Sequence, residues 1–146
     1  MALTRVEKWD TVAFQEFLLA RADVPFAWGT NDCSIFTADG VLAITGTDIA
    51  SDFRGKYESE ETAIALVKKV TGGADVEAAA AWCAEKVGMQ ERLHPMMAQR
   101  GEMVLVQSGD RVIAGLVHLS GRHVVTVAEA GLVRLPITAV KRAWSY

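Results

Sequence analysis

The pattern of apolar residues changes once along the chain, near His94-Pro95, and this change limits the possible folds. Before it, apolar residues recur at helical spacing, and three of the four segments stop at a glycine. After it, short runs rich in β-branched residues alternate with glycine-containing turns. Helices followed by an antiparallel sheet predict an α+β domain. The chain has 146 residues and no repeat or linker, so we expect residues 1–146 to form a single domain.

Helix boundaries are marked by capping residues in the first part of the chain. Asp or Ser before a helix can accept hydrogen bonds from its first N–H groups, and Gly after it adopts the left-handed conformation that ends a helix. The expected helices are 11–21 after Asp10, about 32–45 between Asp32 or Asn31 and Gly46, a helix between Ser59 and Gly72-Gly73, and an alanine-rich helix between Asp75 and Gly88.

Strands are expected in the second part. They are 103–106, 112–119, 123–127 and 132–135, with a hairpin turn at Ser108-Gly109-Asp110 and a final turn from Thr138 into Ala143–Tyr146. In an α+β domain the helix at 32–45 would pack on this sheet, and Cys33 would then lie near residues 80 to 95 positions later.

Composition argues against several classes of function. The net charge is −3, which gives no field for binding nucleic acid. No apolar stretch reaches the roughly 18 residues that span a bilayer, and Met1–Asp10 shows no signal-peptide core, so we expect folding in the cytoplasm. Three histidines and two cysteines lack zinc-site spacing, so no metal or cofactor is expected. Cys83, in the alanine-rich helix, is expected to be a buried apolar group, unpaired with Cys33.

Cys33 is the strongest candidate for a catalytic residue. It falls in the first turn of the predicted helix, after Trp28-Gly29 and the pair Asn31-Asp32. The N–H groups and positive dipole at a helix N-terminus favour a thiolate, which is the nucleophilic form of cysteine. The neighbouring carboxylate of Asp32 opposes this unless capping absorbs its charge. The segment is typical of a cysteine-nucleophile scaffold.

Two segments resemble the NlpC-type cell-wall cysteine peptidases, which have a papain-like fold. Trp28-Gly29 followed by Asp32-Cys33-Ser34 is similar to the family's nucleophile segment, and Gly101–Val106 is similar to the strand that opens its sheet. A branch of small prophage and gene-transfer-agent proteins from tail regions is closer still. The branch resemblance rests on Pro25-Phe26-x-Trp28-Gly29-x-Asn31-Asp32-Cys33, Thr45-Gly46-x-Asp48 and Arg142-Ala143-Trp144. It implies a protein of the phage-type tail tip, made in the host cytoplasm and carried in the virion, with tail-tip or baseplate proteins as partners.

The catalytic histidine of that family has no counterpart here. Its pattern His-apolar-Gly-apolar-aromatic aligns with Ile113-Ala114-Gly115-Leu116-Val117, which puts Ile113 in the place of the base. The orienting third residue would fall near Val125 or Thr126. His118 and His123 are the remaining candidates, but alternation along a strand puts His118 on the face opposite Ile113. A two-residue turn at Ser120-Gly121 would pair His118 with His123, whereas a three-residue turn would put His123 on the Ile113 face but at its far end.

Two functions follow from these residues. The first is a structural tail protein with a papain-like fold and an incomplete cysteine site. The alternative is an active cysteine peptidase, with Cys33 and either His118 or His123 as catalytic residues, that cleaves peptidoglycan during genome entry or processes a tail protein.

Overall fold

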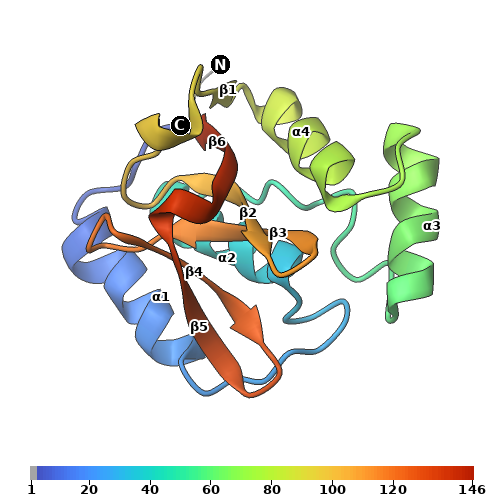
Figure 1. Cartoon of the computed structure of the whole chain (residues 1–146), viewed down its shortest axis with the longest axis horizontal. Coiled ribbons are helices and arrows are strands. Elements are labelled where there is room, and N and C mark those ends of the chain that lie inside the picture. The colour runs from blue at the N-terminus through green and yellow to red at the C-terminus, as the bar shows by residue number, and fades with distance from the viewer. Residues whose placement is uncertain (1–2) are drawn as a thin grey trace.

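Helices come first along the chain and an antiparallel sheet follows, as the computed structural model shows for residues 3–146 (Figure 1). The helices are α1 (Phe14–Arg21), α2 (Cys33–Thr45), α3 (Glu60–Thr71) and α4 (Val76–Val87). The strands are β1 (Gln90–Glu91), β2 (Met103–Ser108), β3 (Arg111–Val117), β4 (His123–Ala128), β5 (Gly131–Pro136) and β6 (Val140–Ser145). They form one six-stranded sheet in the order β1-β6-β2-β3-β4-β5. The predicted α+β class is confirmed.

Three of the four predicted helix starts are confirmed by capping contacts. Asp32, Ser59 and Asp75 each accept a hydrogen bond from a backbone N–H in the first turn of α2, α3 and α4. The prediction for Asp10 was wrong. A π-helical turn at Trp9–Ala13 precedes α1 and is entered from Lys8, whose φ of 56° is left-handed. Asp10 instead accepts a hydrogen bond from the N–H of Thr11.

The C-terminal segment is a strand, so the predicted final turn was wrong. Strand β6 pairs with β1 on one side and β2 on the other, and it buries Trp144, which is 3% exposed. The register shifts where Val140 pairs with Val106 and Arg142 with Leu105, leaving Lys141 as an extra residue. This bulge breaks the alternation of buried and exposed residues on which strand prediction depends.

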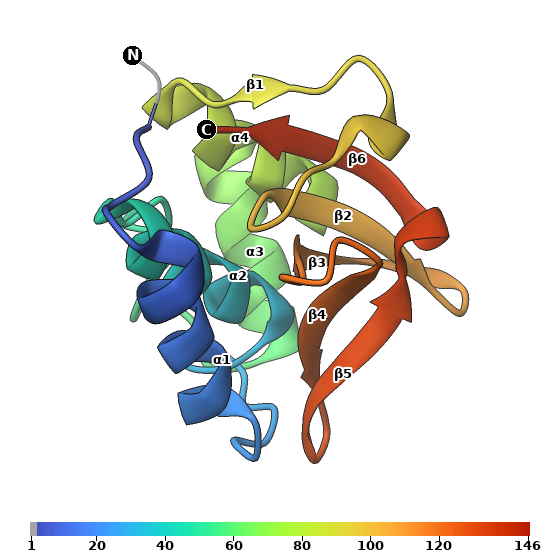
Figure 2. The same ribbon diagram turned by 90° about the vertical axis from the view of Figure 1, so that its left-hand side faces the viewer.

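The core lies between α2 and the sheet. Helix α2 packs on β3 and β4, and it buries Phe36, Val41 and Ile44 completely. Each such side chain contributes about 1.5–3 kcal/mol by leaving water. Figure 2 shows the helices gathered on one side of the sheet. Helix α2 approaches β3 closely at Gly40, where a Cβ would lie 2.2 Å from Cδ1 of Leu116 and would force that side chain to shift.

A second apolar cluster covers the other face of the sheet. It contains Val104, Val106, Val117, Val124, Val140 and Ala143. Residues of β3 therefore divide between two faces: Ala114 and Leu116 belong to the core under the helices, whereas Val117 belongs to the second cluster. This division decides which side chains of β3 can reach the start of α2.

Candidate functional site

The turn before α2 is built around the carboxylate of Asp32, which is 2% exposed. Its Oδ1 accepts hydrogen bonds from the N–H groups of Ser34 (3.0 Å) and Ile35 (2.9 Å), which makes Asp32 the N-cap. Its Oδ2 accepts hydrogen bonds from the N–H of Gly29 (2.8 Å) and the hydroxyl of Tyr57 (2.5 Å). The carboxylate thus occupies N–H groups at the helix start that could otherwise have stabilised a thiolate.

Asn31, the other candidate cap, fixes the loop instead. Its Nδ2 donates to the carbonyls of Val24 (3.1 Å) and Pro25 (2.9 Å), and its Oδ1 accepts from Arg21 of α1 (3.0 Å). Arg21 also pairs with Asp39 of α2 at 2.5 Å. One arginine therefore joins α1, the loop and α2, a contact that the sequence pattern did not indicate.

The Trp28-Gly29 step shapes the turn. Gly29 has a φ of +83°, and a Cβ there would lie 2.1 Å from the carbonyl oxygen of Tyr57. No other residue type fits this position without moving that backbone. Trp28 is half-buried and packs edge-on against Phe26, with ring centroids 5.0 Å apart. Both rings therefore support the turn by packing.

Cys33 is the first residue of α2 and lines a cavity of about 490 Å³. The cavity lies between α2, α3, α4 and β3, and its wall includes Val112, Ile113 and Ala114. The sulfur lies 3.9 Å from the hydroxyl oxygen of Ser34. Within residues 3–146, no histidine lines this cavity.

Burial raises the pKa of the Cys33 thiol above its ordinary value. The nearby backbone amide of Ala114 lowers this pKa, the charge of Asp32 raises it, and Ser34 and Arg111 lower it by smaller amounts. Burial outweighs the lowering contributions because the apolar cavity solvates a thiolate poorly. The charge of Asp32 acts against the thiolate as expected, and burial adds a larger contribution of the same sign.

Ile113 stands where the NlpC-type peptidases, which the sequence resembles, have their histidine. It borders the cavity that Cys33 lines, but its side chain belongs to the other face of the sheet. Ile113 packs against the second apolar cluster, on the far face of the sheet. Val112 and Ala114 point toward the core that contains Cys33. A base on β3 that could reach the sulfur would therefore stand at 112 or 114, and both positions carry aliphatic side chains.

Val125 and Thr126, the two candidates for the residue that would orient a catalytic histidine, make other contacts. Val125 is 2% exposed in the core. The Thr126 hydroxyl donates to the carbonyl of Ala114 at 2.8 Å. Neither side chain orients an imidazole near Cys33.

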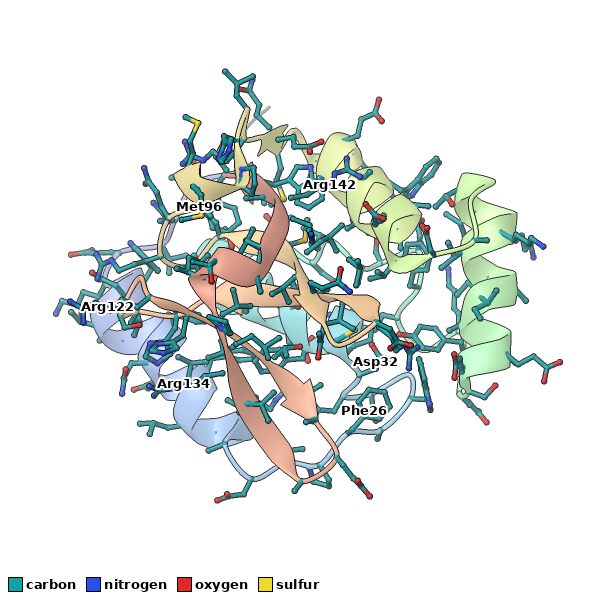
Figure 3. The ribbon with its side chains drawn as sticks, in the orientation of Figure 1. Phe26, Asp32, Met96, Arg122, Arg134 and Arg142 are labelled. Carbon is teal, nitrogen blue, oxygen red and sulfur yellow. The ribbon has the colours of Figure 1, made fainter. Side chains whose placement is uncertain are left out.

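His118 and His123 lie at the other end of β3 and β4. The N–H of His118 donates to the carbonyl of His123 at 2.8 Å, which confirms that the two residues pair. The His118 side chain lies on the same face of the sheet as Cys33. It nevertheless lines a separate cavity beside α1, together with Leu18, Val125 and Arg134. About 13 Å of chain separates positions 114 and 118, and Figure 3 shows Arg134 well apart from Asp32.

The polar contacts of these histidines are local. Nδ1 of His118 accepts from the N–H of Ser120 at 2.9 Å, and Nδ1 of His123 lies 3.4 Å from the Ser120 hydroxyl. Burial, followed by the charges of Arg134 and His123, lowers the pKa of His118. His94 caps the 3₁₀ turn at Pro95–Met97 through the N–H of Met96. The structure therefore does not bring a histidine to Cys33 within the part of the chain it describes.

Cys83 also lines the large cavity, from the α4 side, and it carries a free thiol, as Cys33 does. Burial raises the pKa of Cys83 to about 12. Across residues 3–146 no three His, Cys, Asp or Glu side chains are placed to hold a metal ion. No helix in that range is long and apolar enough to cross a membrane.

Cys33 is the first residue of α2, a helix that Asp32 caps and that packs on the antiparallel sheet. The chain is therefore an α+β protein with a thiol in an apolar cavity. Residues 4–146 match the model of the family described as "Domain of unknown function (DUF6950)", and the chain belongs to that family. No curated protein matches the chain. No solved structure matches it.

Proposed function

We propose that this protein is a structural component of a phage-type tail tip, with a papain-like fold of the NlpC type and a cysteine site that does not hydrolyse peptides. The tail assignment rests on the sequence resemblance at residues 25–33, 45–48 and 142–144. The loss of hydrolysis rests on the geometry at Cys33. The proposed partners are other tail-tip or baseplate subunits, which the protein would join in the host cytoplasm before it enters the virion.

The observation that carries the proposal is the aliphatic character of β3 opposite Cys33. A cysteine hydrolase needs a general base within about 3.2 Å of the thiol, directly or through one water. The same group then protonates the leaving amine. Val112 and Ala114 face the core that holds Cys33 and can do neither. His118 lies in the other cavity, beside Arg134.

The ionisation of Cys33 supports the same conclusion. An ordinary cysteine with a pKa near 8.5 is only a few per cent thiolate at neutral pH. The pKa of Cys33 is raised further by burial, so the nucleophilic fraction is smaller still. A protein with this site can keep the fold of a cysteine peptidase while serving as a building block.

The rate of alkylation of Cys33 by iodoacetamide, measured against pH, tests the chemical part of this proposal. The Cys83→Ala variant provides a background in which one thiol reacts. We expect an apparent pKa above the value of about 8.5 for free cysteine. A value at or below that of free cysteine would show an activated nucleophile and would favour the peptidase that cleaves peptidoglycan or a tail protein.

Incorporation into particles tests the structural part. We expect Cys33→Ser to leave the amount of protein in purified tails, and infection, unchanged. Gly29→Ala, which disturbs the fold, should remove the protein from tails and serves as the positive control. Loss of infection by Cys33→Ser with normal incorporation would contradict the proposal.

A further inference from the structure

The cavity beside Cys33 exists because small side chains meet there from several elements. Alanines from α2, the following loop, α3, α4 and β3 line it: Ala38, Ala50, Ala63, Ala79, Ala80 and Ala114. An alanine side chain ends at Cβ and cannot reach across the gap between helices and sheet. The result is a space of about 490 Å³, within the range of about 300–1,000 Å³ that is usual for small-molecule sites.

Helix α3 forms the outer wall of this cavity. It lies at the edge of the molecule in Figure 1 and packs mainly on α4. An amphipathic helix normally buries its apolar stripe against the core. In α3 no residue is fully buried, and Ala63, Ile64 and Val67 face the cavity instead. Ile64 remains 44% exposed.

The charges at the mouth select against an anionic ligand. Arg111 and Glu60 form an exposed ion pair there at 3.4 Å. Asp75 and Glu77 also line the cavity. Glu77 is paired with Arg142 at 3.6 Å, and Asp75 accepts a hydrogen bond from the N–H of Ala78 in α4. Arg111 is therefore already paired with Glu60, and Asp75 adds a further negative charge to the lining. A ligand with a carboxylate or sulfonate head would be repelled, whereas an uncharged one would not.

We propose that this cavity binds an uncharged small molecule consisting mainly of hydrocarbon, held between α3 and the core with one end near Cys33. Apolar cavities in proteins exclude water and accept apolar molecules; one of about 150 Å³ already holds benzene. This space is roughly three times as large. The inference rests on the proposed function in one respect: Cys33 is a wall of the site and does not attack the ligand.

Two fluorescent probes with the same aromatic skeleton test the inference. N-phenyl-1-naphthylamine is neutral, and 8-anilino-1-naphthalenesulfonate carries a sulfonate. We expect saturable one-to-one binding of the neutral probe, and binding of the sulfonate weaker by at least about tenfold. Equal binding of both probes, or no saturable binding of the neutral probe, would overturn the inference.

A matched pair of variants in α3 locates the bound probe. Ala63 lines the cavity, whereas Ala65 is exposed on the same helix and does not line it. Ala63→Phe fills part of the space and should weaken binding of the neutral probe by about tenfold. Ala65→Phe should leave binding unchanged. Equal effects of the two substitutions would place the probe on the surface and contradict the inference.

Cys33 provides a readout that requires no substitution in α3. The neutral probe should slow alkylation of Cys33 in the Cys83→Ala background, in proportion to its measured occupancy. Unchanged alkylation at saturating probe would contradict the inference even if α3 variants fail to fold. The proposed function fails separately: a low thiol pKa in the absence of probe would remove the non-catalytic assignment and leave ligand binding intact.

Discussion

The hydroxyl of Tyr57 donates a hydrogen bond to Oδ2 of Asp32 across 2.5 Å, although the two residues are 25 positions apart. This contact joins the loop after α2 to the cap at the start of the same helix. Burial and the charge of Asp32 raise the pKa of Tyr57, so its hydroxyl keeps its proton and remains a donor. The turn that presents Cys33 is therefore fixed by residues on both sides of α2.

Removal of this hydroxyl should destabilise the protein. We expect Tyr57→Phe to lower the free energy of unfolding by about 2 kcal/mol, because a hydrogen bond to a buried charge is lost while the ring stays packed. Urea unfolding measures the change. The same substitution in an Asp32→Asn background is the control, and there it should have a much smaller effect. Equal effects in both backgrounds would show that the two side chains are not coupled.

Two glycines with the same left-handed backbone should respond differently to alanine. A Cβ at Gly46 meets nothing within 4 Å, whereas a Cβ at Gly29 lies 2.1 Å from the Tyr57 carbonyl oxygen. Gly46→Ala should cost about 1–2 kcal/mol, from backbone strain alone. Gly29→Ala should cost clearly more, because backbone must move. Similar unfolding midpoints for the two variants would rule out the close contact at Gly29.

Alkaline pH should destabilise the protein through its two thiols, one half-buried and one buried. Folding raises the pKa of Cys83 to about 12 and also raises that of Cys33. Both states are protonated below about pH 8.5, and above it the unfolded chain loses protons first. Stability should then fall by up to about 1.4 kcal/mol per pH unit per thiol, until the folded pKa is reached. Urea unfolding between about pH 7 and 10 measures this slope, and Cys83→Ala should make it shallower. An unchanged slope would count against burial of that thiol in water-free surroundings.

An imidazole placed on the correct face of β3 should activate Cys33. Val112 faces the core that contains the sulfur, whereas Ile113 packs on the opposite face. We expect Val112→His to shift the alkylation profile of Cys33 to lower pH, because a nearby imidazolium stabilises a thiolate. Ile113→His is the matched control and should leave the profile unchanged. The reverse result would mean that the face assignment is wrong.

His118 should titrate independently of Cys33. The charge of Arg134 contributes to the lowered pKa of His118. Arg134→Gln should therefore raise that pKa, as followed by NMR of the imidazole protons, whereas Cys33→Ser should not move it. A shift on Cys33→Ser would indicate a histidine–cysteine pair and would revive the catalytic alternative.

The sequence predicted local features of the fold better than long-range ones. The caps Asp32, Ser59 and Asp75 were found because capping depends on neighbours within three or four residues. Strand β6 was missed because the extra residue Lys141 interrupts its alternation. The two-residue strand β1 carries too little pattern to detect.

In the candidate site, too, local features were predicted and long-range contacts were not. Cys33 was placed at the first turn of its helix from sequence alone. The role of Tyr57 could not be predicted, because nothing near position 57 signals contact with position 32. The net ionisation of the thiol could not be predicted from the sequence for a related reason: desolvation depends on residues of α3, α4 and β3 that line the cavity. Alternation along β3 correctly put His118 and Ile113 on opposite faces of the sheet. It did not show which of the two faces contacts α2 and Cys33.

The four hydrogen bonds of Asp32 are made without the sulfur atom. The turn before α2 therefore does not depend on the thiol of Cys33. A relative with serine or alanine at this place would build the same loop and the same helix entrance. A cysteine at position 33 is therefore not needed for the turn that surrounds it, and its presence does not by itself show that the site is catalytic.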